Sequence, residues 1–250
     1  MNVYIGCSGW YYNHWVDRFY PKDVKKSEWL QYYSQHFPIV EVNSTFYQLP
    51  AKPVIRRWAE STAPGFRFVI KGNRRITHEK LLVDVAADLN ALYESVYLLS
   101  GKLDRVLWQF PPSFKREWDS FKNLERFCRK LQGFGLKSVF EFRDASWLNS
   151  DVLNLFERCG SSYVIADYPA FYRHFYIPAS SDTIYMRMHG RNGDYYTSYS
   201  DEQLNQLAQR LNTYKAQQEI RSVYVLFNND GACHSVYDAK RLMKLLEFAA

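Results

Sequence analysis

The sequence predicts an α/β protein with the architecture of a (β/α)8, or TIM-type, barrel. Short runs rich in β-branched and aromatic residues alternate with amphipathic helical patterns along the whole chain. Eight such runs within 250 residues match the strand number and the usual length of this barrel. Because no linker or low-complexity stretch interrupts residues 1–250, we expect a single domain. A doubly wound open sheet is the alternative architecture.

The expected strands, in chain order, are Val3–Cys7, Ile39–Asn43, Phe66–Lys71, Arg105–Phe110, Ser138–Phe142, Ser162–Ala166, Thr183–His189 and Ser222–Asn228. Helical periodicity lies between most of them, at about 27–36, 53–62, 81–99, 119–132, 149–159, 201–218 and 236–249. Ser27, Asp119 and Ser200 stand where helix N-caps belong. The link between the sixth and seventh strands has no clear helical pattern, which predicts an irregular unit there.

The two faces of the expected strands differ in polarity. Successive side chains of a strand point to opposite faces. One face is apolar, as at Trp108 and Phe110, and suits the layer beneath the helices. The other becomes polar toward the carboxyl end of nearly every strand, as at Glu141 and Arg143. In a closed barrel this second face points inward, and its carboxyl end is where barrel enzymes carry their active sites.

The polar strand ends are therefore predicted to form one site. We expect Glu41, Glu141 and His189 to supply acid–base groups. The residues expected to bind the substrate are Ser8, Trp10, Asn43, Lys71, Gln109, Arg143, Asp167, Arg187, Arg191 and Asn228. The lysine and arginines of this set would clamp an anionic group. The alternative is an ion network whose members only neutralise one another.

Aromatic residues are abundant, with 20 Tyr, 17 Phe and 7 Trp, and many fall in the loops after expected strands. These loops cover residues 10–20, 46–47, 168–176 and 195–199. Aromatic rings there would stack on sugar faces or nucleic-acid bases, or would pack the loops onto the barrel. The net charge of +6 suits an anionic ligand or a nucleic acid, but a solvated surface gives the same total.

No cofactor is predicted from the sequence. The six histidines show none of the usual metal-ligand spacings. A Mg²⁺ or Mn²⁺ ion held by Glu41, Glu141 or Asp167 is the alternative. The four cysteines are scattered, as expected for reduced thiols in a cytoplasmic protein. No apolar run has the roughly 20 residues that a membrane-spanning helix needs, so we expect no membrane partner.

Six motifs resemble, in order, those of the YecE-like proteins, the domain of unknown function 72 family. They are YIGCSGWYYNHW with a following FYP, VEVNSTFYQLP, FRFVIKGNRRITH, LWQFPPSF, FEFRDASW and YMRMHGR. The resemblance runs from Tyr4 to about Asn229. It implies a TIM-type barrel and a cytoplasmic bacterial protein whose activity is not established, and it supplies no catalytic residues to carry over.

Three functions are compatible with these features. The favoured one is an enzyme, a hydrolase, lyase or isomerase, that acts on a small anionic or sugar-like substrate through acid–base groups and an anion clamp. The second is a nucleic-acid-binding or phosphodiester-processing protein. The third is a non-catalytic ligand-binding barrel. The substrate, the reaction type and the oligomeric state are open.

Overall fold

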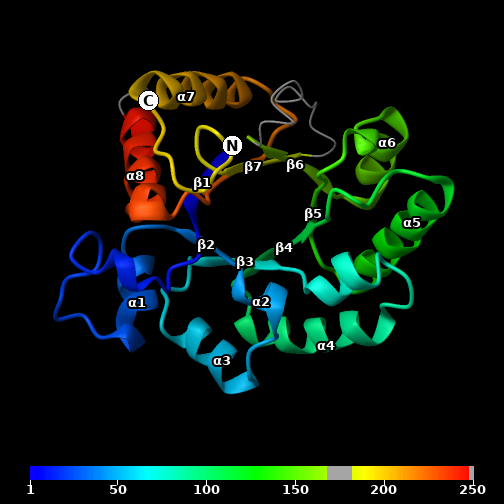
Figure 1. Cartoon of the computed structure of the whole chain (residues 1–250), viewed down its shortest axis with the longest axis horizontal. Coiled ribbons are helices and arrows are strands. Elements are labelled where there is room, and N and C mark those ends of the chain that lie inside the picture. Colours follow the sequence, from blue (N-terminus) through cyan, green and yellow to red (C-terminus); the bar gives the residue numbers. More distant parts are fainter. Residues whose placement is uncertain (168–181, 248–250) are drawn as a thin grey trace. The chain divides into compact units, whose positions relative to one another are not determined.

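The computed structural model of the protein describes residues 1–167 and 182–247. Eight parallel strands close into a barrel in chain order, from β1 to β8, which confirms the predicted fold class (Figure 1). The strands are β1 (Asn2–Ser8), β2 (Ile39–Val42), β3 (Arg67–Lys71), β4 (Leu103–Gln109), β5 (Ser138–Glu141), β6 (Ser162–Ala166), β7 (Thr183–Met188) and β8 (Ser222–Phe227). The irregular unit expected between the sixth and seventh strands falls on residues outside those described.

The chain divides into two compact units. The first unit comprises residues 1–41 and 165–250, and the second comprises residues 42–164. The expected single domain over residues 1–250 stays a prediction. Within the described residues, no helix combines the length and the apolar character that crossing a bilayer requires.

The α-helices are α1 (Trp29–Ser34), α2 (Ser44–Tyr47), α3 (Lys52–Glu60), α4 (Ala86–Val96), α5 (Trp118–Gly133), α6 (Ser150–Cys159), α7 (Asp201–Lys215) and α8 (His234–Glu247). In the first unit, α7 and α8 lie side by side (Figure 1). Ser200 is the N-cap of α7, as predicted: its Oγ accepts from the Gln203 N–H at 3.2 Å, and Gln203 Oε1 accepts from the Ser200 N–H at 2.9 Å. Ser27 lies in a 3₁₀ turn before α1 and Asp119 lies inside α5, so those two cap predictions are wrong.

The helix expected over residues 81–99 begins later than its apolar pattern indicates. Leu81, Leu82 and Asp84 have φ angles of 46°, 71° and 47°, in the left-handed region that an α-helix excludes. The chain therefore turns repeatedly before α4 starts at Ala86. Leu82 and Val85 are nevertheless buried, so the apolar spacing reports burial of this turn rather than helix.

Ring contacts confirm which strand face meets the helices. In the second unit, Trp108 of β4 packs edge-on against Phe127 of α5, with centroids 4.8 Å apart. Phe140 of β5 stacks on Phe156 of α6 at 4.7 Å. The predicted apolar face is therefore the helix-facing one in this unit.

The opposite strand face carries a tyrosine layer in the first unit. Tyr4 of β1 is in register with Tyr224 of β8, which is in register with Tyr185 of β7. The Tyr4 and Tyr185 rings stack on the Tyr224 ring, at 5.0 Å and 5.7 Å between centroids. This layer supports the polar side chains that follow it toward the carboxyl ends of the strands.

Candidate active site

Glu41, on β2, is the centre of a buried polar network in the first unit. Its carboxylate accepts from Ser8 Oγ at 2.7 Å and from the Tyr185 hydroxyl at 2.8 Å. The Arg187 guanidinium donates to it through Nε, at 3.1 and 3.0 Å from the two oxygens, and through Nη2 at 2.7 Å. Ser8 is the register partner of Glu41 across β1 and β2, which explains why a short serine side chain can reach it.

The Glu41 carboxyl stays ionised although its side chain is fully buried. Burial raises the pKa of this carboxyl, but the adjacent Arg187 charge and the hydrogen bonds from Arg187, Ser8 and Tyr185 lower it below the usual value. Two carboxylate oxygens offer about four acceptor positions, and these donors occupy them. Glu41 is therefore a fixed anion that holds Arg187 in place.

The network continues from Arg187 to the end of β7. Arg187 Nη1 lies 3.2 Å from His189 Nε2, and His189 Nδ1 lies 3.3 Å from Asp167 Oδ1. An arginine can only donate, so Nε2 is the accepting nitrogen and Nδ1 carries the proton that faces Asp167. His189 is fully buried. The arrangement fixes a neutral imidazole between a cation and a carboxylate.

Asp167, which follows β6, anchors the far end of this chain of hydrogen bonds. Its carboxylate accepts from the His189 backbone N–H at 2.5 Å and from the Tyr199 hydroxyl. That hydroxyl in turn accepts from the Gly190 N–H at 2.8 Å. Gly190 has a φ of 93°, so the backbone turns away from β7 here and brings the loop of residues 190–199 back onto Asp167.

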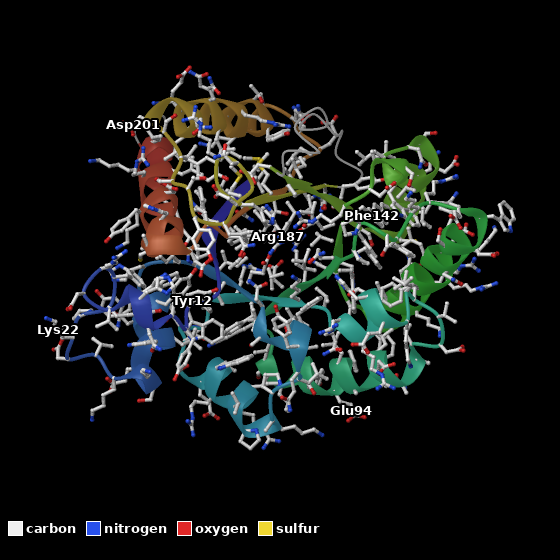
Figure 2. The ribbon with its side chains drawn as sticks, viewed as in Figure 1. Tyr12, Lys22, Glu94, Phe142, Arg187 and Asp201 are labelled. Carbon is white, nitrogen blue, oxygen red and sulfur yellow. The ribbon has the colours of Figure 1, made fainter. Side chains whose placement is uncertain are left out.

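Several side chains of the first unit are accessible beside the network. Figure 2 shows Arg187 among interior side chains, whereas Lys22 and Asp201 lie at the periphery. Tyr12, Tyr195 and Asn228 are partly exposed. The Tyr12 hydroxyl donates to the Ser8 carbonyl oxygen at 2.8 Å, and the Tyr195 ring meets the His189 ring edge-on at 5.2 Å.

The other predicted residues of this unit have different surroundings. Asn228 follows β8, and its backbone N–H donates to the Met188 carbonyl oxygen at 2.7 Å. Trp10 is buried, and its carbonyl oxygen accepts from the Tyr20 hydroxyl at 2.5 Å. Arg191 is exposed in the loop after β7. The burial of Trp10 is compatible with loop packing, one of the two interpretations of the aromatic residues, and its substrate-binding role stays a prediction.

Glu141, Arg143 and Gln109, which were also predicted for the site, belong to the second unit. Arg143 Nη2 forms an ion pair with the fully buried Glu141 carboxylate. Gln109, at the end of β4, is the register partner of Glu141, and its side-chain amide donates to the Phe110 carbonyl oxygen at 2.9 Å.

The remaining candidates of this unit, Asn43 and Lys71, lie at the ends of β2 and β3. Lys71 Nζ lies 4.3 Å from the centroid of the Phe46 ring, a cation–π contact. Asn43, just after β2, has a buried Oδ1 atom without a hydrogen-bond partner. His78 meets the same Phe46 ring at 4.9 Å. Burial and the nearby Lys71 and Arg74 charges lower the pKa of His78.

The structure joins five of the residues predicted from the strand ends into one hydrogen-bonded network: Ser8, Glu41, Asp167, Arg187 and His189. Sequence reasoning missed Tyr185 and Tyr199, which complete it. The parity of β7 placed Tyr185 on the polar face, two residues before Arg187, and that signal could have found it. Tyr199 reaches Asp167 through loop geometry, which leaves no periodic signal.

Two predicted arginines each face a carboxylate, Arg187 with Glu41 and Arg143 with Glu141. Such pairing is expected of an ion network. Each arginine already has a carboxylate of the protein as its counter-ion, so neither acts as an anion-binding group by itself. Among residues 1–167 and 182–247, no three His, Cys, Asp or Glu side chains are grouped as metal ligands. The expectation of no resident cofactor stays a prediction.

The sequence matches the model of a family described as protein of unknown function DUF72, over residues 4–250. The UPF0759 protein YunF of Bacillus subtilis (strain 168) is 28% identical over 275 aligned positions, which cover 98% of this chain and 95% of YunF. The UPF0759 protein YecE of Escherichia coli (strain K12) is 36% identical over 112 positions, 45% of this chain and 39% of YecE.

Solved structures share the overall fold of this chain. A DUF72 family protein of Thermotoga maritima MSB8 superposes with a TM-score of 0.85 at 27% identity, covering 99% of this chain and 100% of that one. A D-psicose 3-epimerase superposes with a TM-score of 0.57 at 10% identity, covering 100% and 98% of the two chains, a likeness of fold alone. The near-complete family match and the shared barrel establish that this chain belongs to the DUF72 family.

Proposed function

We propose that the protein is an enzyme that performs acid–base chemistry on a small polyhydroxylated or anionic substrate at the carboxyl ends of its strands. The observation that carries the proposal is the buried chain of contacts from Glu41 through Arg187 and His189 to Asp167. Burying ionised groups costs several kcal/mol per ion before their attraction offsets it. Apolar side chains would fill the same space at least as stably, so a chemical role is the better explanation of these groups.

In this proposal His189 is the acid–base group. Asp167 holds the proton on Nδ1, so Nε2 is the nitrogen that would take up a substrate proton, in place of the hydrogen bond that it accepts from Arg187. Glu41 has its acceptor positions filled, which favours a role in orienting Arg187 over the acid–base role expected from the sequence. Arg187 would then stabilise negative charge that develops on a substrate oxygen.

The charge balance favours a sugar-like substrate over a strong anion. Arg187 faces Glu41, so its guanidinium is neutralised within the protein. The partly exposed Tyr12, Tyr195 and Asn228 offer ring faces and hydrogen-bonding groups of the kind that bind sugar hydroxyls. Lys71, Gln109, Asn43 and Arg191 stay candidates for substrate binding.

Two proteins that share the fold have names that concern sugars: the D-psicose 3-epimerase and a xylose isomerase domain containing protein from Salmonella typhimurium LT2. A shared fold does not carry an activity, so the proposal rests on the network and not on these names. It assigns no cofactor, and it locates the protein in the cytoplasm on the basis of the scattered cysteines.

Binding is tested first, by thermal shift with neutral ketoses and aldoses, sugar phosphates, inorganic phosphate, dicarboxylates and short single-stranded DNA. Each is measured at two salt concentrations. A ligand present at 100 times its Kd adds about 2.7 kcal/mol of stability. We expect a neutral sugar to raise the melting temperature at both salt concentrations. Asn228→Ala should weaken this rise, whereas Asn205→Ala on the exposed surface of α7 should leave it unchanged.

Chemistry is tested by incubating the bound sugar with the protein in D2O and following its carbon-bound protons by NMR. Acid–base catalysis next to a carbonyl predicts loss of one proton signal with wild type and none with His189→Asn. If His189→Asn does not fold, the proton exchange measured with wild type and its comparison with Asn228→Ala still test whether the protein catalyses acid–base chemistry. A rise only with DNA that disappears at high salt would support the nucleic-acid function instead. No rise with any compound would favour a non-catalytic barrel.

A further inference from the structure

The loop after β8 has a strained backbone in the first unit. Ala232 and Cys233 have φ angles of 52° and 69°, in the left-handed region that non-glycine residues occupy only when their surroundings hold them there. Tyr195, in the loop after β7, has a φ of 66°. The Gly231 N–H donates to the Tyr195 carbonyl oxygen at 3.3 Å, so the two strained loops are joined. Strain of this kind is concentrated at binding and catalytic sites.

Asp230 is the carboxylate that this loop positions. Its carbonyl oxygen accepts from the Cys233 N–H at 3.0 Å and from His14 Nε2, of the loop after β1, at 2.8 Å. The residue is partly exposed. Within residues 1–167 and 182–247, its carboxylate forms no ion pair and accepts no hydrogen bond from another residue. The backbone of Asp230 is therefore fixed, whereas its side chain can receive hydrogen bonds from a ligand.

On one side, contacts lead from Asp230 to the buried network. The His14 and Tyr12 rings have centroids 5.4 Å apart, and the Tyr12 hydroxyl donates to the Ser8 carbonyl oxygen at 2.8 Å. The Ser8 hydroxyl donates to the Glu41 carboxylate at 2.7 Å. Burial and the Asp230 charge raise the pKa of the Tyr12 phenol, which agrees with a carboxylate close to that side chain.

On the other side, contacts lead from the same loop to His189. The N–H that binds the Tyr195 carbonyl oxygen belongs to the residue after Asp230, and the Tyr195 ring meets the His189 ring edge-on at 5.2 Å. Arg187 joins His189 to Glu41, at 3.2 Å from the imidazole and 2.7 Å from the carboxylate. Asp230 therefore stands on a closed ring of contacts that includes the proposed acid–base residue, and this ring belongs entirely to the first unit.

The Asp230 carboxyl has an electrostatic environment opposite to that of Glu41. Burial raises the pKa of Asp230, while its own backbone N–H and the nearby His14 oppose this effect. Glu41 is more deeply buried, yet its pKa is lowered, because an arginine, a serine and a tyrosine donate to it. The difference between the two carboxyls is the supply of hydrogen-bond donors. A ligand that brings donors would therefore stabilise the ionised form of Asp230.

The charges around this ring disfavour a strongly anionic ligand. Glu41 is paired with Arg187. Asp167, which contacts the ring through His189, receives its hydrogen bonds from a neutral imidazole, a backbone N–H and a tyrosine hydroxyl. In the part of the chain that the structure describes, neither Asp167 nor Asp230 is paired with a lysine or arginine. Two carboxylates without a paired cation would repel a phosphate, whereas a neutral ligand with hydroxyl donors fits them.

We propose that Asp230 is a substrate-binding residue that selects neutral sugars, because its carboxylate accepts hydrogen bonds from two adjacent hydroxyl groups of a ketose or aldose. This inference rests on the proposed function, since it requires that a sugar binds at this ring of contacts. The two carboxylate oxygens match two neighbouring hydroxyl donors. The partly exposed Tyr12 and Tyr195 offer aromatic faces for the apolar side of the sugar.

The test is isothermal titration calorimetry of the full-length protein with D-fructose, D-psicose, D-xylose and D-fructose 6-phosphate. We expect Asp230→Asn and Asp230→Ala to weaken the binding of the neutral sugars at least about tenfold, the scale of one hydrogen bond to a charged group. Binding of the phosphorylated sugar relative to the neutral ones should improve in both variants, because a negative charge is removed. Asp23→Asn, which removes the same charge from an exposed turn before α1, is the matched control and should change neither affinity.

The outcomes separate this inference from the proposed function. Neutral sugars that bind Asp230→Asn as tightly as wild type would overturn the role of Asp230 and leave the acid–base proposal intact. Binding that depends on Asp230 but brings no exchange of carbon-bound protons would overturn the acid–base proposal alone. If wild type binds none of the sugars, both are overturned. Circular dichroism checks that the variants are folded, and if Asp230→Ala is not, the isosteric asparagine variant decides.

Discussion

Arg187 and Glu41, 146 positions apart in the chain, form a bidentate ion pair in which both side chains are almost completely buried. Nε contacts both carboxylate oxygens at 3.1 and 3.0 Å, and Nη2 lies 2.7 Å from Oε1. Charge neutralisation and hydrogen bonding are combined in one contact, so removing one partner has a different effect from removing both.

Glu41→Gln should lower the free energy of unfolding by about 3–5 kcal/mol, because it leaves the Arg187 guanidinium buried without its counter-charge. The double variant Glu41→Gln with Arg187→Met should lose less, since no uncompensated charge remains. Urea unfolding of wild type, both single variants and the double variant measures the coupling. A double variant that loses the sum of the single losses would show that the two residues are not coupled.

The stabilisation that Glu41 provides should disappear in acid. The pKa of its carboxyl is lower in the folded protein than in the unfolded chain, where glutamate titrates near about 4.3. The unfolded chain therefore binds more protons around that pH, and the contribution is complete above it and lost as pH falls through the folded value.

The measurement is the free energy of unfolding of wild type minus that of the Glu41→Gln and Arg187→Met double variant, from pH 7 to pH 3. We expect this difference to become smaller below about pH 4, because wild type loses stability there relative to the double variant. Asp194, whose pKa is lowered by the Thr197 and Tyr196 backbone N–H groups, titrates in both proteins and cancels. A difference that is constant over this range would contradict the ion-pair assignment.

Tyr199→Phe should cost about 1–3 kcal/mol of stability, because the lost hydroxyl leaves both the Gly190 N–H and an Asp167 oxygen without a partner. Tyr196→Phe is the matched control. Tyr196 is 72% exposed, and its change should stay within about 0.5 kcal/mol. Chemical denaturation of the two variants compares them directly, and equal stabilities would refute the role given to Tyr199.

Gly6→Ala should prevent folding or cost more than about 3 kcal/mol, because a Cβ there would lie 2.2 Å from the Ile39 carbonyl oxygen across β1 and β2. Gly133→Ala, at the end of α5, is the control with open space around the new methyl group. It should stabilise the protein by about 0.4–1 kcal/mol by restricting the unfolded chain. Thermal unfolding monitored by circular dichroism distinguishes the two outcomes, and a Gly6→Ala protein as stable as wild type would be inconsistent with this close approach.

The alternation of apolar and polar residues along the strands predicted the barrel and the first-unit network. It could do so because strand register places polar residues of neighbouring strands opposite each other. Ser8 and Glu41 are register partners, so a polar residue at the end of one strand identifies its neighbour across the sheet. Tyr185 and Arg187 follow on one face of β7 for the same reason. These relations are local to strands, and a single sequence contains them.

What the sequence could not supply depends on loops and tertiary contact. The left-handed turns at Leu81, Leu82 and Asp84 replace a helix that the apolar spacing favoured, because burial and helicity give the same pattern there. The contact of Tyr199 with Asp167 joins chain segments that no periodic pattern connects.

The ion pair of Glu41 and Arg187 also sets an order of events during synthesis. Translation at about 5–20 residues per second separates the two side chains by roughly 7–30 s. Residues 42–164 are synthesised in full during this interval, so the second unit is complete while Glu41 still lacks its partner. The nascent chain must keep that carboxylate hydrated until β7 leaves the ribosome, and the first unit, which is discontinuous in sequence, is the one completed last.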